Sequence, residues 1–188
     1  MNNLLKKSIK KYQEKQDLIY KIQKLSNEIR ARSKKAIALL RRDNIKESQE
    51  TIKKAERDFG LISKLVKKNS DLLNYGFYRE AVEEYIEALT FYNFLTKSNK
   101  QIPDFVKKGS EEIISGICDF TGELVRKAIT IASPESSQEI LLYKKAIEDV
   151  VEELTKIAFF GKLRQKYDEA ERNLKRIEGI LYEIKMKK

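Results

Sequence analysis

Residues 4–42 limit the fold of this chain more than any other segment, because neither glycine nor proline interrupts them. Apolar side chains recur there mostly every three or four residues, from Ile9 to Leu40. This spacing predicts one long amphipathic helix with an apolar seam along one side. The whole chain has two prolines and seven glycines among 188 residues, which favours further long helices over a β-sheet.

The boundaries of the later helices follow from capping and helix-breaking residues. Asp43-Asn44 can cap a second helix, Tyr75-Gly76 separates it from a third, and Ser133-Pro134-Glu135 can open a fifth. A break near Gly109 or Gly116 would divide the fourth helical region. The helices are expected at about 4–42, 45–74, 77–95, 104–132, 134–159 and 162–186. With no alternating strand pattern and no repeat, we predict an all-α fold, an antiparallel bundle of six or seven helices in a single domain, residues 1–188.

The absence of histidine excludes several catalytic classes. Ser-His-Asp hydrolases, histidine-based ribonucleases and zinc hydrolases each lose a required group. Any catalysis must therefore use carboxylates, lysines, hydroxyls or a hard metal ion. The single cysteine, Cys118, cannot form an internal disulfide, and the sequence shows neither a signal peptide nor an apolar run as long as a membrane span. We expect a cytoplasmic protein that does not enter a membrane.

The positive charge of the chain is concentrated at its N-terminal end. Residues 1–42 contain 13 lysines and arginines against three acids, which accounts for the whole formal net charge of +10. A basic helical face is often only a solvated surface. Because the whole excess lies on one helix, a nucleic-acid-binding surface gains support here. The residues expected to contact phosphates are Arg30, Arg32, Lys34, Lys35 and Arg41.

Two pairs of acidic residues form the candidate site. Glu84 and Glu87 lie three residues apart, and Asp119 lies four residues before Glu123. Residues at these spacings are neighbours on one side of a helix, and two such pairs facing each other would make an oxygen-rich pocket suited to Mg2+ or Mn2+. The first pair shares a stripe with phenylalanines, which predicts that it is buried and needs a cation. That cation could equally be a lysine or arginine of a neighbouring helix, and the second pair could form a solvent-facing edge.

Several segments of the chain resemble the translin and translin-associated factor X (TRAX) family. Residues 119–124, Asp-Phe-Thr-Gly-Glu-Leu, followed by Arg126, are similar to the core motif of the family. Residues 84–91 are similar to the acidic helix of the TRAX branch, and residues 33–41 to the end of its first helix. Parts of residues 167–184 resemble the final helix of the family. The similar segments occur in the same order and cover most of the chain.

The resemblance implies an all-helical fold that assembles into closed, roughly octameric shells enclosing RNA or single-stranded DNA. In the TRAX branch, metal-dependent endoribonuclease activity depends on four acids, and the positions that match them here are Glu84, Glu87, Asp119 and Glu123. The translin branch binds nucleic acid but lacks part of this acid set. The two branches divide these tasks in mixed complexes, so a homo-oligomer of this chain must perform both or find a partner.

The leading hypothesis is a Mg2+- or Mn2+-dependent endoribonuclease that acts on single-stranded RNA within a homo-oligomeric shell. A bound ion would lower the pKa of a water molecule, and the hydroxide would attack the phosphorus. Arg126, which is also expected to bind the nucleic acid, or Lys127 would stabilise the negative charge. Because no histidine can activate a ribose 2′-hydroxyl, we predict 5′-phosphate and 3′-hydroxyl products. The alternatives are a translin-like shell that binds RNA or single-stranded DNA without chemistry, an all-α nucleoside triphosphate pyrophosphatase, and a purely structural coiled-coil role.

Overall fold

The computed structural model of the protein describes residues 2–67 and 69–186, and these residues contain helices and connecting loops but no strand. This confirms the predicted all-α bundle. The six α-helices are α1 (Asn2–Arg41), α2 (Ile45–Leu65), α3 (Gly76–Thr96), α4 (Ser110–Ile131), α5 (Ser137–Thr155) and α6 (Gly161–Met186), and the two short 3-10 helices are η1 (Ser70–Asn74) and η2 (Pro134–Ser136). Among the described helices, none combines the length and the apolar content that a membrane crossing requires.

Four of the predicted boundaries differ from the structure: the end of the second helix, the start of the fourth and both ends of the fifth, which ends at Thr155 instead of about residue 159. The second helix was expected to continue to about Asn74 but ends at Leu65, and η1 then places Leu72 in the core with none of its surface exposed. The fourth region begins only after Gly109, whose backbone N–H donates a hydrogen bond of 2.7 Å to the Glu112 side chain. At the fifth helix, the Ser133 side chain accepts a hydrogen bond from the Ser136 backbone, which caps η2 before α5 starts.

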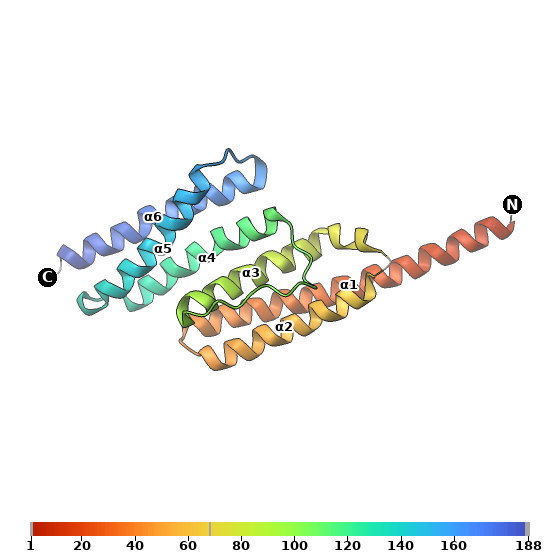
Figure 1. Cartoon of the computed structure of the whole chain (residues 1–188), viewed down its shortest axis with the longest axis horizontal. Helices are drawn as coiled ribbons and strands as arrows, with labels where there is room; N and C mark the ends of the chain where they lie inside the picture. The colour runs from red at the N-terminus through yellow and green to blue at the C-terminus, as the bar shows by residue number, and fades with distance from the viewer. Residues whose placement is uncertain (1, 68, 187–188) are drawn as a thin grey trace.

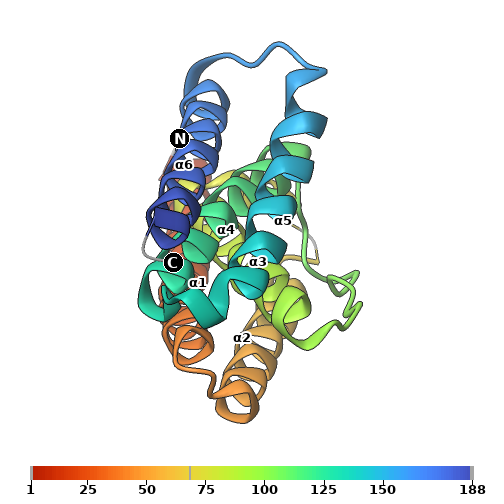
Figure 2. The ribbon, with the colours of Figure 1, turned by 90° about the vertical axis from the view of Figure 1, so that its left-hand side faces the viewer.

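The helices form two hairpins that enclose a central pair. Figure 1 shows α1 and α2 as one antiparallel hairpin and α5 and α6 as the other, with α3 and α4 between them. The end view in Figure 2 shows the same order, and α3 packs on α1 and α4, while α4 packs on α6. A loop over residues 97–109 carries the chain back along the bundle, so that α3 and α4 run in the same direction.

Contacts along the two central helices show this parallel alignment. Arg79 near the start of α3 pairs with Glu112 near the start of α4, and further along the ring of Phe120 contacts both Phe91 and Phe94. Positions further along α3 therefore meet positions further along α4, as they do in two helices that run in the same direction. This register decides which polar side chains of the two helices can share a site.

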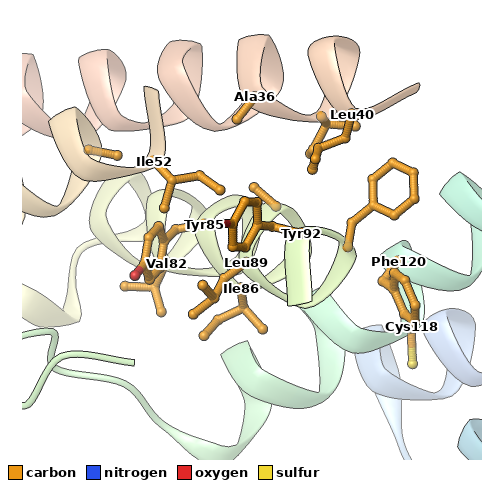
Figure 3. Close-up of a cluster of buried hydrophobic side chains, with 14 of the residues drawn as sticks. Ala36, Leu40, Ile52, Val82, Tyr85, Ile86, Leu89, Tyr92, Cys118 and Phe120 are labelled. Carbon is orange, nitrogen blue, oxygen red and sulfur yellow. The ribbon is translucent and has the colours of Figure 1, made fainter. Parts of the chain in front are cut away.

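Helix α3 is buried on most of its circumference. Figure 3 shows Ala36 and Leu40 of α1 and Ile52 of α2 packed over a face of α3 that includes Tyr85, while Ile86 lies on the side towards α4. The Tyr85 hydroxyl donates a hydrogen bond of 2.8 Å to Glu56, which satisfies its polar end inside the core. Because α3 has neighbours on several sides, acids on its remaining face also lie close to other helices.

Candidate acidic site

A cavity of about 350 Å3 lies between α1, α3, α4 and α6, and the two predicted acid pairs meet there. The parallel register of α3 and α4 sets one pair beside the other, because both pairs span about one helical turn in the same direction. The structure therefore brings together all four acids that the sequence pointed to. The residues that line the cavity are Lys34, Ile37, Arg41, Glu84, Glu87, Asp119, Gly122, Glu123, Arg126, Glu169 and Asn173.

Glu87 has the most perturbed carboxyl group in the cavity. Only 9% of its surface is exposed, and within the described residues it has neither an ion pair nor a side-chain hydrogen bond. Burial raises its pKa to about 8, and the negative charges of Asp119, Glu84 and Glu123 add to the increase, while Lys166 opposes it. A group in this position gains from any cation that enters the cavity.

Two other acids are held by basic residues at the rim. Burial raises the pKa of Glu84, and Lys34, whose Nζ lies 3.8 Å from Glu84 Oε2, partly offsets this. Burial likewise raises the pKa of Glu123, although Arg126 Nη1 donates a hydrogen bond of 2.8 Å to Oε1. Arg41 Nε lies 3.1 Å from Glu123 Oε2, which makes an ion pair but not a hydrogen bond. Both atoms are therefore buried without a hydrogen-bond partner.

Helix α6 supplies site residues that sequence reasoning missed. Lys166 Nζ donates a hydrogen bond to Asp119 Oδ1, and Asn173 donates one of 2.9 Å to Thr121 beside the cavity. Burial lowers the pKa of Lys166, but the hydrogen bond to Asp119 and the negative charges of Asp119, Glu169 and Glu83 together outweigh this, and the net pKa is raised. Glu169, three residues further along α6, contributes a fifth carboxyl group to the lining. Glu169 and Asn173 lie within residues 167–184, parts of which resemble the family's final helix, and Lys166 directly precedes them, but nothing in their own spacing distinguishes these three from other polar residues of α6.

The predicted phosphate-binding residues divide into two groups. Lys34, Arg41 and Arg126 line the cavity. The other three lie outside its lining, each in an ion pair of its own: Arg30 with Glu80, Arg32 with Glu28 and Asp58, and Lys35 with Glu47. The basic charge of α1 is thus shared between the acidic site and the packing of α1 against α2 and α3.

The oxygen donors of the site suit a hard divalent cation, although the side chains are not arranged as a coordination shell. Within the described part of the chain, no group of three or more Asp, Glu, Cys or His side chains is arranged to hold a metal ion. The acids nevertheless offer only carboxylate oxygens, the donors that Mg2+ and Mn2+ prefer. Glu123 Oε2 is buried without a hydrogen bond, and Glu87 is buried without a counter-ion. Glu84, Glu87, Asp119 and Glu123 are the residues that would hold such an ion.

Comparisons with known proteins identify relatives of the chain. A sequence model of the Translin family matches residues 17–188. The chain is 28% identical over 189 residues to a translin-associated protein X homolog of Schizosaccharomyces pombe, covering 90% of this chain and 82% of that protein. It is also 29% identical over 130 residues to an uncharacterized protein of Methanocaldococcus jannaschii, covering 63% of this chain and 57% of that protein.

Solved structures show the same fold. AfC3PO in complex with duplex RNA superposes with a TM-score of 0.87 at 22% identity, covering 98% of this chain and 97% of that chain. Apo-NeC3PO superposes with a TM-score of 0.80 at 19% identity, covering 95% of each chain. These identities establish a shared architecture, and the sequence match over residues 17–188 establishes kinship. This chain belongs to the Translin family.

Proposed function

We propose that the protein is a Mg2+- or Mn2+-dependent endoribonuclease that acts on single-stranded RNA. The observation that carries this proposal is the meeting of four acids from α3 and α4 in one cavity whose rim holds Lys34, Arg41 and Arg126. Carboxylates grouped beside phosphate-binding cations are the parts that metal-assisted hydrolysis of a phosphodiester requires. Family membership supports the proposal, since a solved structure with this fold contains duplex RNA.

Each group of side chains has a separate task in the proposed reaction. Glu84, Glu87, Asp119 and Glu123 would hold the ion, which when bound supplies an activated water and neutralises charge on the phosphate. Arg126 has an exposed side chain at the cavity rim, where it can bind a phosphate oxygen while keeping its contact with Glu123. Lys34 and Arg41 on the opposite helix would orient the RNA backbone. The predicted products carry 5′-phosphate and 3′-hydroxyl ends.

Assembly into a closed, roughly octameric homo-oligomer would place this site inside a shell. Support comes from the shared fold with AfC3PO and NeC3PO and from the family match. Light scattering of the purified protein tests the assembly, and a mass equal to one 22.0 kDa chain would contradict it.

Cleavage of a single-stranded RNA oligomer tests the catalytic proposal. The Glu87→Gln and Asp119→Asn variants should lose about 100-fold or more in rate with Mn2+, roughly the effect of removing one electrostatic contact from a transition state. Both should still bind the oligomer, because the cations at the rim remain. Analysis of the product ends should give 5′-phosphates, and 2′,3′-cyclic phosphates would contradict the proposed route. Nucleoside triphosphates incubated in parallel distinguish a pyrophosphatase.

A nucleic-acid-binding protein without catalysis is the second candidate. It is favoured by the ion pairs that already occupy three of the four acids and by the lack of an assembled ligand group among the described residues. In that case wild type and both variants would bind RNA equally and cleave it at the same background rate.

A further inference from the structure

Lys166 differs from the other basic residues of the acidic site in its position. Its side chain is 21% exposed, and its ammonium group pairs with Asp119, whose side chain is 26% exposed. Lys34 and Arg126, by contrast, are more than half exposed and contact their acids from the rim. Lys166 therefore has the least solvent access of these three cations and binds an acid that the proposed function assigns to the ion.

The charge of Lys166 reaches beyond Asp119. It also opposes the rise in the pKa of Glu87, the buried acid that has no ion pair of its own within the described residues. A lysine ammonium is a compact point charge with three donors on a flexible four-carbon chain. It can thus stand between carboxylates as a small cation does, and it can withdraw without movement of the backbone.

A destination for the displaced ammonium group is present on the same helix. Glu169 lies three residues after Lys166 on α6 and lines the acidic cavity, and it already attracts the Lys166 charge, as does Glu83. Residues three apart on a helix are neighbours, so the ammonium group can move to Glu169 by rotation of its side chain alone. An entering cation would take over the contact with Asp119 at little cost in unpaired charge.

We infer that Lys166 acts as a resident cation of the acidic site, holding Asp119 in the metal-free protein and competing with the divalent ion for it. The inference rests on the proposed function, because it concerns the ion that the site would bind. Lys166 then sets the affinity of the site for the divalent ion, because Asp119 cannot contact the Lys166 ammonium group and the ion at the same time. The competition between the ammonium group and the ion for Asp119 corresponds to a measurable coupling free energy.

The Lys166→Met variant tests this competition, because it keeps the apolar stem and removes the charge. Calorimetric titration of Mn2+ into protein stripped with EDTA should give a dissociation constant lower than that of wild type by about 5- to 150-fold, the usual range for coupled sites. The increase in Tm on addition of Mn2+ should also be larger than in wild type, since Asp119 has no ammonium partner in the metal-free variant. Lys166→Gln repeats both measurements with a neutral polar side chain, should the methionine variant fail to fold.

Lys162→Met is the matched control. Lys162 lies one turn earlier on α6 and pairs with Glu83. Glu83 does not line the acidic cavity, whereas Asp119, the partner of Lys166, does. Replacement of Lys162 should leave the Mn2+ dissociation constant unchanged. A Lys166 variant with wild-type or weaker Mn2+ affinity overturns the inference, and if wild type still cleaves RNA with Mn2+, the proposed function stands without it. If neither wild type nor the Lys166 variants bind Mn2+, both ideas fail together.

Discussion

Glu87 is a residue whose burial suits the acidic site rather than the stability of the core. Its carboxyl group is buried against the polar side chains of α4, where its neighbours are acids, and its pKa is raised to about 8. A core position on α3 would be more stable with an apolar or amide side chain, because an unpaired buried charge is costly. A cation that binds among these acids would remove this penalty, so the residue fits a metal site better than a purely structural one.

The pH dependence of stability should therefore report on Glu87 in the metal-free protein. In the unfolded chain this carboxyl group has the ordinary glutamate pKa of 4.5, whereas in the folded protein the pKa is about 8. Between these pH values the folded state keeps a proton that the unfolded state releases. The free energy of unfolding contributed by this group is fully present below pH 4.5 and decreases as pH rises towards 8. The decrease can reach a few kcal/mol, since one pKa unit corresponds to about 1.4 kcal/mol.

Urea unfolding in EDTA at pH 5 and pH 8 measures this decrease. Glu87→Gln should be the more stable protein at pH 8 and should show a smaller difference between the two pH values than wild type. Glu80→Gln, which changes an acid on the same helix whose side chain is 52% exposed, is the control. Equal pH dependence in wild type and Glu87→Gln would contradict the assignment.

At the same scale, sequence reasoning found the acids but not their partners. Their spacing and the family resemblance identified the four acids, Glu84, Glu87, Asp119 and Glu123. Lys166, which pairs with Asp119, and the α6 residues Glu169 and Asn173 of the cavity lining were not identified, because a helical pattern tells which face is polar but not which polar residues turn towards another helix. That information lies in the packing of α6 on α4, which depends on side chains distributed along both helices.

Among the elements, the contact between α3 and α4 decides the geometry of the site, and Gly116 sets its closeness. A Cβ atom at this position would lie 2.6 Å from the Glu83 carbonyl oxygen and 2.7 Å from Ile86 Cβ. The sequence allowed a helix break near Gly116, whereas the structure shows α4 continuous through it. The antiparallel arrangement predicted for the bundle does not extend to α3 and α4, because a loop of the length of 97–109 can connect helices in either direction.

Gly116→Ala should push α3 and α4 apart and destabilise the protein by about 1–3 kcal/mol, as overpacking in a close-packed core does. Gly60→Ala is the matched control, because Gly60 lies within α2 and has nothing within 4 Å of its added Cβ. That change should stabilise the protein by up to about 1 kcal/mol through helix propensity. Chemical denaturation of the two variants measures both effects, and a neutral Gly116→Ala would show that the helices separate easily.

On the scale of the whole molecule, α1 carries the excess positive charge, packs against α2 and α3 and borders the acidic cavity. This helix of 40 residues extends past one end of the bundle at its N-terminus (Figure 1). Its C-terminal part supplies Lys34, Ile37 and Arg41 to the lining of the acidic cavity. Residues 1–42 carry the whole charge excess of the chain. Composition predicts a basic helix, but only the fold shows that Arg41 lies at the cavity whereas Arg32 pairs with Asp58, a buried residue of α2.

Arg41→Ala and Arg32→Ala should consequently affect different properties. We expect Arg41→Ala to weaken binding of single-stranded RNA and to reduce the slope of log affinity against log salt concentration by about 0.7, because one phosphate is no longer neutralised by the protein. Arg32→Ala should leave affinity and slope unchanged but lower the free energy of unfolding by about 1–3 kcal/mol, because Asp58 is left without its cation while Arg32 itself is one-third exposed. Fluorescence anisotropy in EDTA over a salt series, with urea unfolding of both variants, measures the two effects. If both variants reduced the salt slope equally, α1 would bind RNA along its whole basic length and not at the cavity.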